Sequence, residues 1–189
     1  MTELTDNILI LRCKARDSDA FRILVESYKK QAYTFAFSYL KNSDDALNVS
    51  QEAFIKVWKY IDTFLENRLF RPWLFGIIKN LSINLINKKK NLGEISLDKA
   101  MDESGFDIHD TAKDPLHAVV DKETGQQVWK AVFELKDEFR EIIILKHFHD
   151  LSYSEIAGTL DIPEGTVMSR LYYARIELKR KLEQVIQRG

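Results

Sequence analysis

The sequence has few of the residues that interrupt helices, and it cannot form an internal disulfide. Among its 189 residues are seven glycines, three prolines and one cysteine, Cys13. So few helix breakers favour a mostly helical chain, and a lone cysteine is compatible with a reducing compartment. No apolar run approaches the length of a membrane span, and the N-terminus lacks a signal-peptide pattern. We therefore expect a soluble, cytoplasmic protein without direct membrane contact.

What the sequence does contain is the pattern of a helix-turn-helix, between Leu151 and Leu182. Ser152 and Glu155 form an S-x-x-E capping box, which starts a helix because each side chain satisfies an orphan backbone donor of the other residue. After a short turn, Pro163 stands where the first turn of a second helix tolerates proline. Apolar residues then recur at helical spacing and predict a buried stripe: Val167, Leu171, Ala174, Leu178 and Leu182.

The residues between those of the stripe must face outward. They are Thr166, Ser169, Arg170, Tyr172, Tyr173 and Arg175. From residue 166 to 189 the chain carries six basic and two acidic residues, a local net charge of +4 in a chain whose net charge is −1. A second helix with hydroxyls, aromatics and arginines on its free face suits the major groove of DNA. The alternative is a helical hairpin with a solvated charged face.

The N-terminal half predicts a bundle of helices. Residues 4–40 favour a helix broken near Asp17, whose short acidic side chain suits an N-cap. A second helix starts at Ser43 and Asp44, and a loop over 62–70 separates it from a helix opened by Pro72. The candidate core of the two later helices is the apolar set Leu47, Ala53, Phe54, Val57, Trp58, Ile61, Trp73, Leu74, Ile77, Ile78, Leu81 and Leu85.

The composition changes after residue 91. Acidic and small polar residues dominate 92–115, without helical periodicity, which predicts a flexible, self-repelling linker. Asp114 and Pro115 then suit a cap and a first helical position, followed by helices over about 116–135 and 137–149. The predicted fold is all-α, with two small helical domains, 1–91 and 116–189, joined by this linker.

Aromatic and basic residues gather in the loop and helix between residues 64 and 90. The aromatics are Phe64, Phe70, Trp73 and Phe75, and the cations are Arg68, Arg71, Lys79, Lys88, Lys89 and Lys90. Rings that stack on bases, interleaved with cations that follow the phosphates, are what single-stranded DNA requires. Asn80 and Asn84 carry amides that can hydrogen-bond a base edge. The alternative is that the aromatics belong to the core.

Three segments, 45–58 (DALNVSQEAFIKVW), 71–84 (RPWLFGIIKNLSIN) and 151–175 (LSYSEIAGTLDIPEGTVMSRLYYAR), together resemble the bacterial RNA polymerase sigma factors of the extracytoplasmic-function class. The resemblance covers nearly all of residues 20–185. It implies an alternative sigma factor with conserved region 2 over 1–91, a linker over 92–115, and region 4 over 116–189. It also implies no enzymatic activity, no cofactor and no metal site.

The resemblance assigns residues to three surfaces. Binding to the clamp helices of core RNA polymerase is assigned to Asp45, Asn48, Gln51, Glu52, Phe54 and Trp58. Recognition and melting of the minus-ten element, with a base flipped into the 62–70 loop, is assigned to Phe64, Arg71, Trp73, Phe75, Lys79, Asn80, Asn84, Lys88 and Lys89. Recognition of the minus-thirty-five element is assigned to Thr166, Met168, Ser169, Arg170, Tyr172, Tyr173 and Arg175. Further expected partners are the polymerase flap, promoter DNA as duplex and melted strand, and a cognate anti-sigma factor, which in this class is often membrane-bound.

Four positions depart from the pattern of the class. Asn48 stands where an acidic residue is usual, which affects one polymerase contact. Gly76 and Asn84 replace a common arginine and a common aspartate, which affects contacts near the melted strand. Met168 replaces a usual cation at the start of the recognition helix, which affects the promoter sequence that is read.

Three other classes of protein are alternatives: a transcription regulator, a helical adaptor and an enzyme. A transcription regulator would use its helix-turn-helix as a dimer on palindromic half-sites and would need a sensing or dimerising N-terminal half. A helical adaptor would bind only protein. An enzyme is disfavoured because no phosphate loop or activated nucleophile is present. In addition, His147 and His149 stand two apart on a predicted helix and point in different directions, which makes them a poor metal pair.

Overall fold

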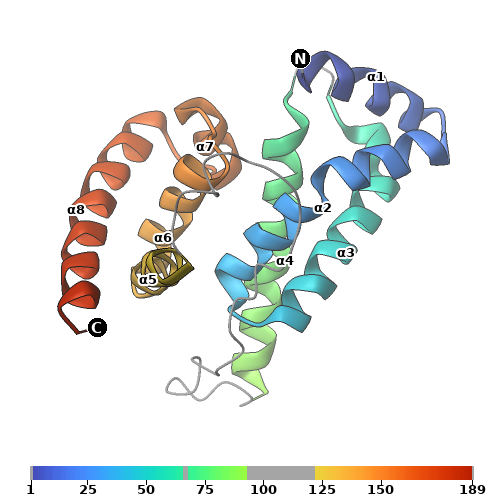
Figure 1. Cartoon of the computed structure of the whole chain (residues 1–189). Helices are drawn as coiled ribbons and strands as arrows, with labels where there is room; N and C mark the ends of the chain where they lie inside the picture. Colours follow the sequence, from blue (N-terminus) through green and yellow to red (C-terminus); the bar gives the residue numbers. More distant parts are fainter. Residues whose placement is uncertain (1, 66–67, 93–121, 189) are drawn as a thin grey trace.

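The computed structural model describes residues 2–65, 68–92 and 122–188, and within these ranges the chain is helical and contains no strand (Figure 1). The elements are α1 (Thr2–Lys14), α2 (Ser18–Leu40), α3 (Ser43–Tyr60), the 3-10 turn η1 (Ile61–Thr63), α4 (Phe70–Asn91), α5 (Lys122–Phe133), α6 (Asp137–Ile143), the π-helical turn η2 (Ile144–Phe148), α7 (Tyr153–Leu160) and α8 (Glu164–Arg188). The predicted all-α fold is confirmed. The predicted linker beyond residue 92, its Asp114–Pro115 cap and residues 116–121 of the next predicted helix lie outside the described residues.

Side-chain caps set where the N-terminal helices begin. The Asp17 carboxylate accepts hydrogen bonds from the backbone N–H groups of Asp19 and Ala20, at 2.9 and 3.1 Å, and so starts α2. Asn42 caps α3 in the same way, through the N–H of Asp45 at 2.9 Å. Each such cap contributes about 1 kcal/mol. The predicted break near Asp17 is therefore confirmed.

Helices α1 to α4 pack around apolar side chains, among which Phe35 of α2 stacks on Phe75 of α4 with ring centroids 4.6 Å apart. Leu24, Leu74 and Ile78 are also fully buried. Burying a side chain of this size stabilises the fold by about 1.5–3 kcal/mol. The core therefore fixes α4 against α2 and determines which face of α4 remains outside.

The helix-turn-helix forms as predicted. Ser152 Oγ accepts from the N–H of Glu155 at 3.2 Å, while the Glu155 carboxylate accepts from the N–H of Ser152 at 2.7 Å. Asp161 ends α7 in the left-handed conformation, with φ of 56°. Val167 and Leu171, the first two residues of the predicted stripe of α8, are buried. Figure 1 shows α7 and α8 as neighbouring helices of the C-terminal half.

Two predictions about local structure are wrong in detail. Leu47, assigned to the core, is 48% exposed, because the smaller Ala46 and Ser50 of α3 face the neighbouring helices instead. The helix predicted over 137–149 is regular only in α6 and continues as the wider turn η2, where the N–H of His149 donates to the carbonyl of Ile144 at 3.1 Å.

The two helical halves are in contact with each other. The buried apolar residues of both halves form one continuous cluster, in which α4 packs against α7 and α2 packs against α6. Figure 1 shows α4, in green, at the boundary with the C-terminal helices. Separately, no helix among the described residues is long and apolar enough to cross a membrane.

Candidate nucleic-acid interface

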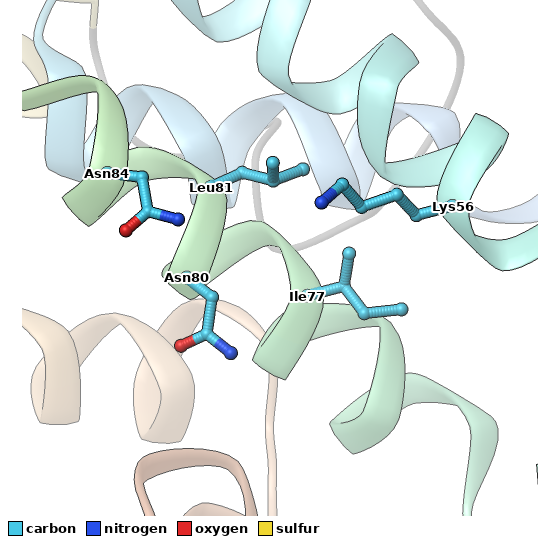
Figure 2. Close-up of a pocket in the computed structure, with 5 residues that line it drawn as sticks. All are labelled: Lys56, Ile77, Asn80, Leu81 and Asn84. Atoms are coloured by element: carbon cyan, nitrogen blue, oxygen red, sulfur yellow. The ribbon is translucent and has the colours of Figure 1, made fainter. Parts of the chain in front are cut away.

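A small hollow lies on the outer side of α4, where α3 runs alongside (Figure 2). Its volume is about 190 Å³, and its walls are Lys56, Ile77, Asn80, Leu81 and Asn84. The two asparagines stand one helical turn apart on α4, so both amides point to the same side. The hollow therefore combines two amides and one cation with an apolar wall. Lys56 of α3 was not among the residues assigned from sequence, because no local pattern distinguishes it from a solvated lysine.

Most of the aromatic residues assigned to the minus-ten strand belong to the core. Phe64 and Phe75 are buried, so neither ring can stack on a base in this structure. Trp73 is half-buried and packs against Phe64 and Phe70, with centroid separations of 5.0 and 6.0 Å. The alternative that the aromatic residues belong to the core therefore applies to Phe64 and Phe75. The ring of Trp73 remains partly exposed to solvent.

The assigned cations of α4 divide into two groups. Arg71 and Lys79 both contact α7 of the C-terminal half. At the end of α4, Lys88 is exposed, whereas Lys89 forms an ion pair with Asp45 of α3. Asp45, assigned to polymerase binding, and Lys89, assigned to DNA, therefore engage each other.

The outer face of α8 presents the residues assigned to the minus-thirty-five element. Met168, Ser169, Tyr172 and Tyr173 are exposed, the two tyrosine rings lying edge to face with centroids 5.3 Å apart. Thr166 is half-buried.

The two arginines of that face are anchored to the helices behind them. Arg170 forms an ion pair with Glu138 of α6 at 3.6 Å, and Arg175 donates to Nε2 of His147 at 3.4 Å. Burial and the charge of Arg175 lower the pKa of His147, so the imidazole is neutral and can accept this hydrogen bond. Each guanidinium is therefore oriented at the edge of the exposed face.

A third surface lies on α3. Asn48, Gln51 and Glu52 are exposed, and they lie on one face of the helix with the exposed apolar residues Leu47 and Ile55. Exposed aliphatic side chains beside polar ones are typical of a protein-binding surface. Leu47 and Ile55 were missed from sequence, although their spacing from Gln51, one turn on either side, is a signal that sequence offers.

Two residues assigned to this surface lie elsewhere. Phe54 is buried in the core. Trp58 packs on Phe21, with ring centroids 4.8 Å apart, and the guanidinium of Arg16 lies 5.6 Å from its ring. Phe54 and Trp58 therefore pack on the side of α3 that faces the neighbouring helices. Among the described residues, no cluster of three or more histidine, cysteine or acidic side chains is placed to hold a metal ion.

Comparison with known proteins accounts for this combination of surfaces. Residues 24–91 match the family Sigma-70 region 2, and residues 125–178 match Sigma-70, region 4. The chain is 35% identical to the ECF RNA polymerase sigma factor SigW of Bacillus subtilis, over 93% of this chain and 96% of that protein. It is 31% identical to the ECF RNA polymerase sigma-E factor of Escherichia coli K12, over 98% of each.

Solved structures are similar as well. The sigma factor RpoE of Bartonella quintana, in a co-crystal structure with the anti-sigma factor NepR, has 26% identity and a TM-score of 0.67, covering 86% of this chain and 96% of that one. CnrH, in complex with the cytosolic domain of CnrY, has 23% identity and a TM-score of 0.70, covering 95% and 98% of the two chains. The second of these shows likeness of fold alone.

Among the described residues the chain is all-helical, with a Sigma-70 region 2 match in one half and a helix-turn-helix within a region 4 match in the other, as in a promoter-recognition protein. The chain belongs to the extracytoplasmic-function sigma factors of bacterial RNA polymerase. It is an alternative sigma factor that binds core RNA polymerase and directs promoter-specific transcription initiation. Sigma factors are DNA-recognition subunits and not enzymes in their own right, so the regulator, adaptor and enzyme alternatives give way to this function.

Proposed function

We propose that the hollow between α3 and α4 receives one unstacked base of the melted minus-ten strand. The observation that supports this is that Lys56, Asn80 and Asn84 line the same small space (Figure 2). Its volume of about 190 Å³ is below the roughly 300–1,000 Å³ of small-molecule sites, which suits a single group of a polymer better than a cofactor.

Each wall of the hollow has a chemical part in holding a base. The amides of Asn80 and Asn84 can each donate and accept, as the hydrogen-bonding edge of an unpaired base requires. Ile77 and Leu81 offer an apolar surface to the face of the base, and Lys56 supplies a cation for an adjacent phosphate. Extruding a base costs a few kcal/mol, and such a pocket offsets that cost.

The other two surfaces take the remaining roles. The exposed face of α8, with Met168, Ser169, Tyr172 and Tyr173, reads the minus-thirty-five element in the major groove, and its arginines contact the flanking phosphates. The exposed face of α3 around Gln51, Glu52 and Ile55 docks on core polymerase.

We extend the proposal to an anti-sigma partner. The similar Bartonella quintana sigma factor forms a complex with the anti-sigma factor NepR. This chain exposes apolar side chains on α3 (Leu47, Ile55) and α8 (Met168, Ile176) that a protein partner could cover. We expect such a partner to bind the free chain and to suppress run-off transcription, and we expect excess core polymerase to relieve that inhibition. Inhibition that excess core polymerase does not relieve would contradict the proposal.

The base-capture role is tested by run-off transcription with core polymerase on a promoter library randomised at the minus-ten element. We expect Asn80→Ala to lower transcription from the preferred promoter about tenfold, since one base contact contributes roughly 1–3 kcal/mol of discrimination, and to relax the preference at one position. Lys56→Ala should lower activity without changing base preference. Asn91→Ala, which removes an exposed amide at the end of the same helix, is the matched control.

A pre-melted template separates capture of the base from folding defects. On a bubble promoter the unpairing cost is already absent, so Asn80→Ala should recover part of its activity there. Unchanged base preferences at every minus-ten position, with Asn80→Ala as active as Asn91→Ala, would exclude the hollow as the base site.

A further inference from the structure

Arg71 and Lys79, two cations of α4 assigned to the melted DNA strand, bind helix α7 of the other half of the chain. The Arg71 guanidinium lies 3.5 Å from Glu155 Oε1, and the Lys79 amine donates to the carbonyl of Leu160 at 3.0 Å. The two residues stand about two turns apart on α4. Glu155 lies in the first turn of α7 and Leu160 is its last residue, so α4 holds α7 at both ends.

Both contacts are electrostatically favourable and shielded from solvent. The side chains of Arg71 and Glu155 are 29% and 15% exposed. Burial alone would raise the pKa of Glu155, but hydrogen bonds from Ser152 and the charge of Arg71 lower it, so the carboxylate stays ionised at neutral pH. The Lys79 ammonium meets the carbonyl end of a helix, where the helix dipole favours a cation.

Further contacts show that the halves form an organised interface. The His149 ring is buried against Phe35 and Phe75, with centroid distances of 5.8 and 4.7 Å. On α2, the Lys41 amine donates to the carbonyl of Phe133 at 3.0 Å. Glu141 of α6 is half-buried, and the charge of Lys79 is near enough to lower its pKa. The structure therefore describes a closed arrangement in which α7 covers part of the α4 surface.

We infer that region 4 and the melted promoter strand compete for the same two side chains, Arg71 and Lys79, so that the free sigma factor is closed and strand binding opens it. The inference rests on the proposed strand-binding role of α4. A phosphate cannot approach the two cations while α7 occupies them, and α7 cannot stay once both are turned to phosphates.

Competition of this kind has a measurable size. Affinity for a ligand that binds only the open form is lowered by the fraction of chains that are open. If about one chain in ten is open, within the usual range for a minor state, a variant that is always open binds single-stranded DNA about tenfold more tightly. The gain requires no new contact with DNA.

The test uses the full chain with fluorophores on cysteines introduced at the exposed Lys29 of α2 and Lys179 of α8, with the buried Cys13 replaced by alanine. The probe is a single-stranded 12-mer of randomised sequence, which reports phosphate contacts. His149→Arg places a charge between Phe35 and Phe75 and should open the interface. Ile23→Arg is the matched control, since it adds the same charge at an exposed position of α2.

We expect energy transfer between the labels to fall as DNA is added to the wild-type chain. It should be low from the start in His149→Arg, which should bind the probe about tenfold more tightly, whereas Ile23→Arg should remain closed. Lys79→Ala should weaken DNA binding more in the His149→Arg background than in the wild type. In the wild type the same substitution also removes a contact that holds α7, and this opening offsets part of the lost phosphate contact. Glu141→Lys, which places a like charge near Lys79, is a second opening variant. It replaces His149→Arg if that variant fails to fold, as judged by the loss of cooperative unfolding.

Two outcomes would overturn the inference, and a third concerns its premise. Equal affinity of closed and opened chains, with energy transfer unchanged at saturating DNA, would show that strand binding and closure are independent, and the proposed strand site would stand. Persistence of the closed state in both opening variants would show that these contacts do not hold it. Failure of the opened chain to bind the probe at low salt would instead remove the strand site itself.

Discussion

The imidazole of His149 lies against the phenyl ring of Phe75, with their centroids 4.7 Å apart, and so joins the two halves of the chain. Among the described residues, no group lies within hydrogen-bond distance of its buried Nε2. Burial, and to a lesser extent the charge of Arg71, lowers the pKa of His149 from 6.5 to about 4. The ring is therefore neutral in the folded chain at neutral pH.

This depressed pKa predicts acid sensitivity in a defined range. Because an exposed histidine gains a proton near pH 6.5 and the buried one only near pH 4, the folded chain should lose stability as the pH falls from 6.5 to 4, by up to about 3 kcal/mol. Above pH 6.5 and below pH 4 this contribution should be constant. Urea titrations across the range measure it.

His149→Gln is the reference for that measurement, because it removes the titrating ring while Glu155 and Glu141 titrate as before. The difference in unfolding free energy between wild type and His149→Gln should change with pH only between about 4 and 6.5. A difference that is flat throughout this range would show that His149 is solvated in the native chain.

The exposed face of α3 predicts which substitution separates polymerase binding from folding. Ile55 is 67% exposed, so Ile55→Asp should leave the unfolding free energy within about 0.5 kcal/mol of the wild type. Affinity for core polymerase should fall about tenfold or more, because the charge must be desolvated at the docked surface. Glu52→Lys should act in the same direction. Fluorescence anisotropy titration with core polymerase, in the absence of DNA, measures the effect.

Ile23→Asp is the matched control, since Ile23 is an exposed isoleucine of α2, outside the α3 face. It should retain the wild-type affinity for polymerase. Wild-type binding by both Ile55→Asp and Glu52→Lys would move the docking surface away from α3.

The capping box of α7 predicts a local stability effect. Ser152→Ala leaves the N–H of Glu155 without its acceptor and should lower the unfolding free energy by about 1 kcal/mol. Ser154→Ala, which alters an exposed hydroxyl 3.1 Å from that of Ser152, should change it by less than about 0.5 kcal/mol. Equal effects of the two substitutions in urea unfolding would mean that the box does not stabilise α7.

Features that depend on neighbours in the sequence could be predicted from it. The Asp17 cap, the Ser152–Glu155 box and the buried stripe beginning at Val167 involve residues a few positions apart, whose interactions follow from helix geometry alone. The family resemblance added the order of the two regions, and both are matched.

Leu47 shows where periodicity stops being sufficient. An apolar pattern locates a buried face only to within about one residue, so a leucine next to that face is predicted to be core. The small Ala46 and Ser50 face inward because neighbouring helices approach closely there, which leaves Leu47 outside. The exposed Leu47 is thereby available to the proposed docking face of α3.

The contact between the halves could not be predicted, because it joins residues far apart in the chain. Lys79 and Leu160 are separated by 81 positions, and from sequence a lysine in this place is indistinguishable from a solvated one. The π-helical turn η2 adds to the difficulty, since a wider turn shifts the angular position of later residues such as His149 away from the 3.6-residue repeat.

Met168 predicts an altered promoter preference. It is 52% exposed and follows the buried Val167 in the first turns of α8, where the class usually has a cation. A cation there can donate to guanine O6 and N7, whereas a thioether has no donor and can pack on a thymine methyl. Met168→Arg should therefore increase transcription from promoters with guanine at one minus-thirty-five position and decrease it elsewhere, by roughly 1–3 kcal/mol of discrimination.

Run-off transcription with core polymerase on a library randomised across the minus-thirty-five element decides this prediction. Ile176→Arg is a suitable control, because Ile176 is equally exposed on α8 two turns further from its start, and an added charge there should raise activity on all promoters alike through phosphate contacts. A shift confined to one base position in Met168→Arg, absent from Ile176→Arg, is the expected result. Identical base preferences in wild type and Met168→Arg would show that the side chain at 168 does not face the bases, and discrimination would then depend on Ser169, Tyr172 and Tyr173.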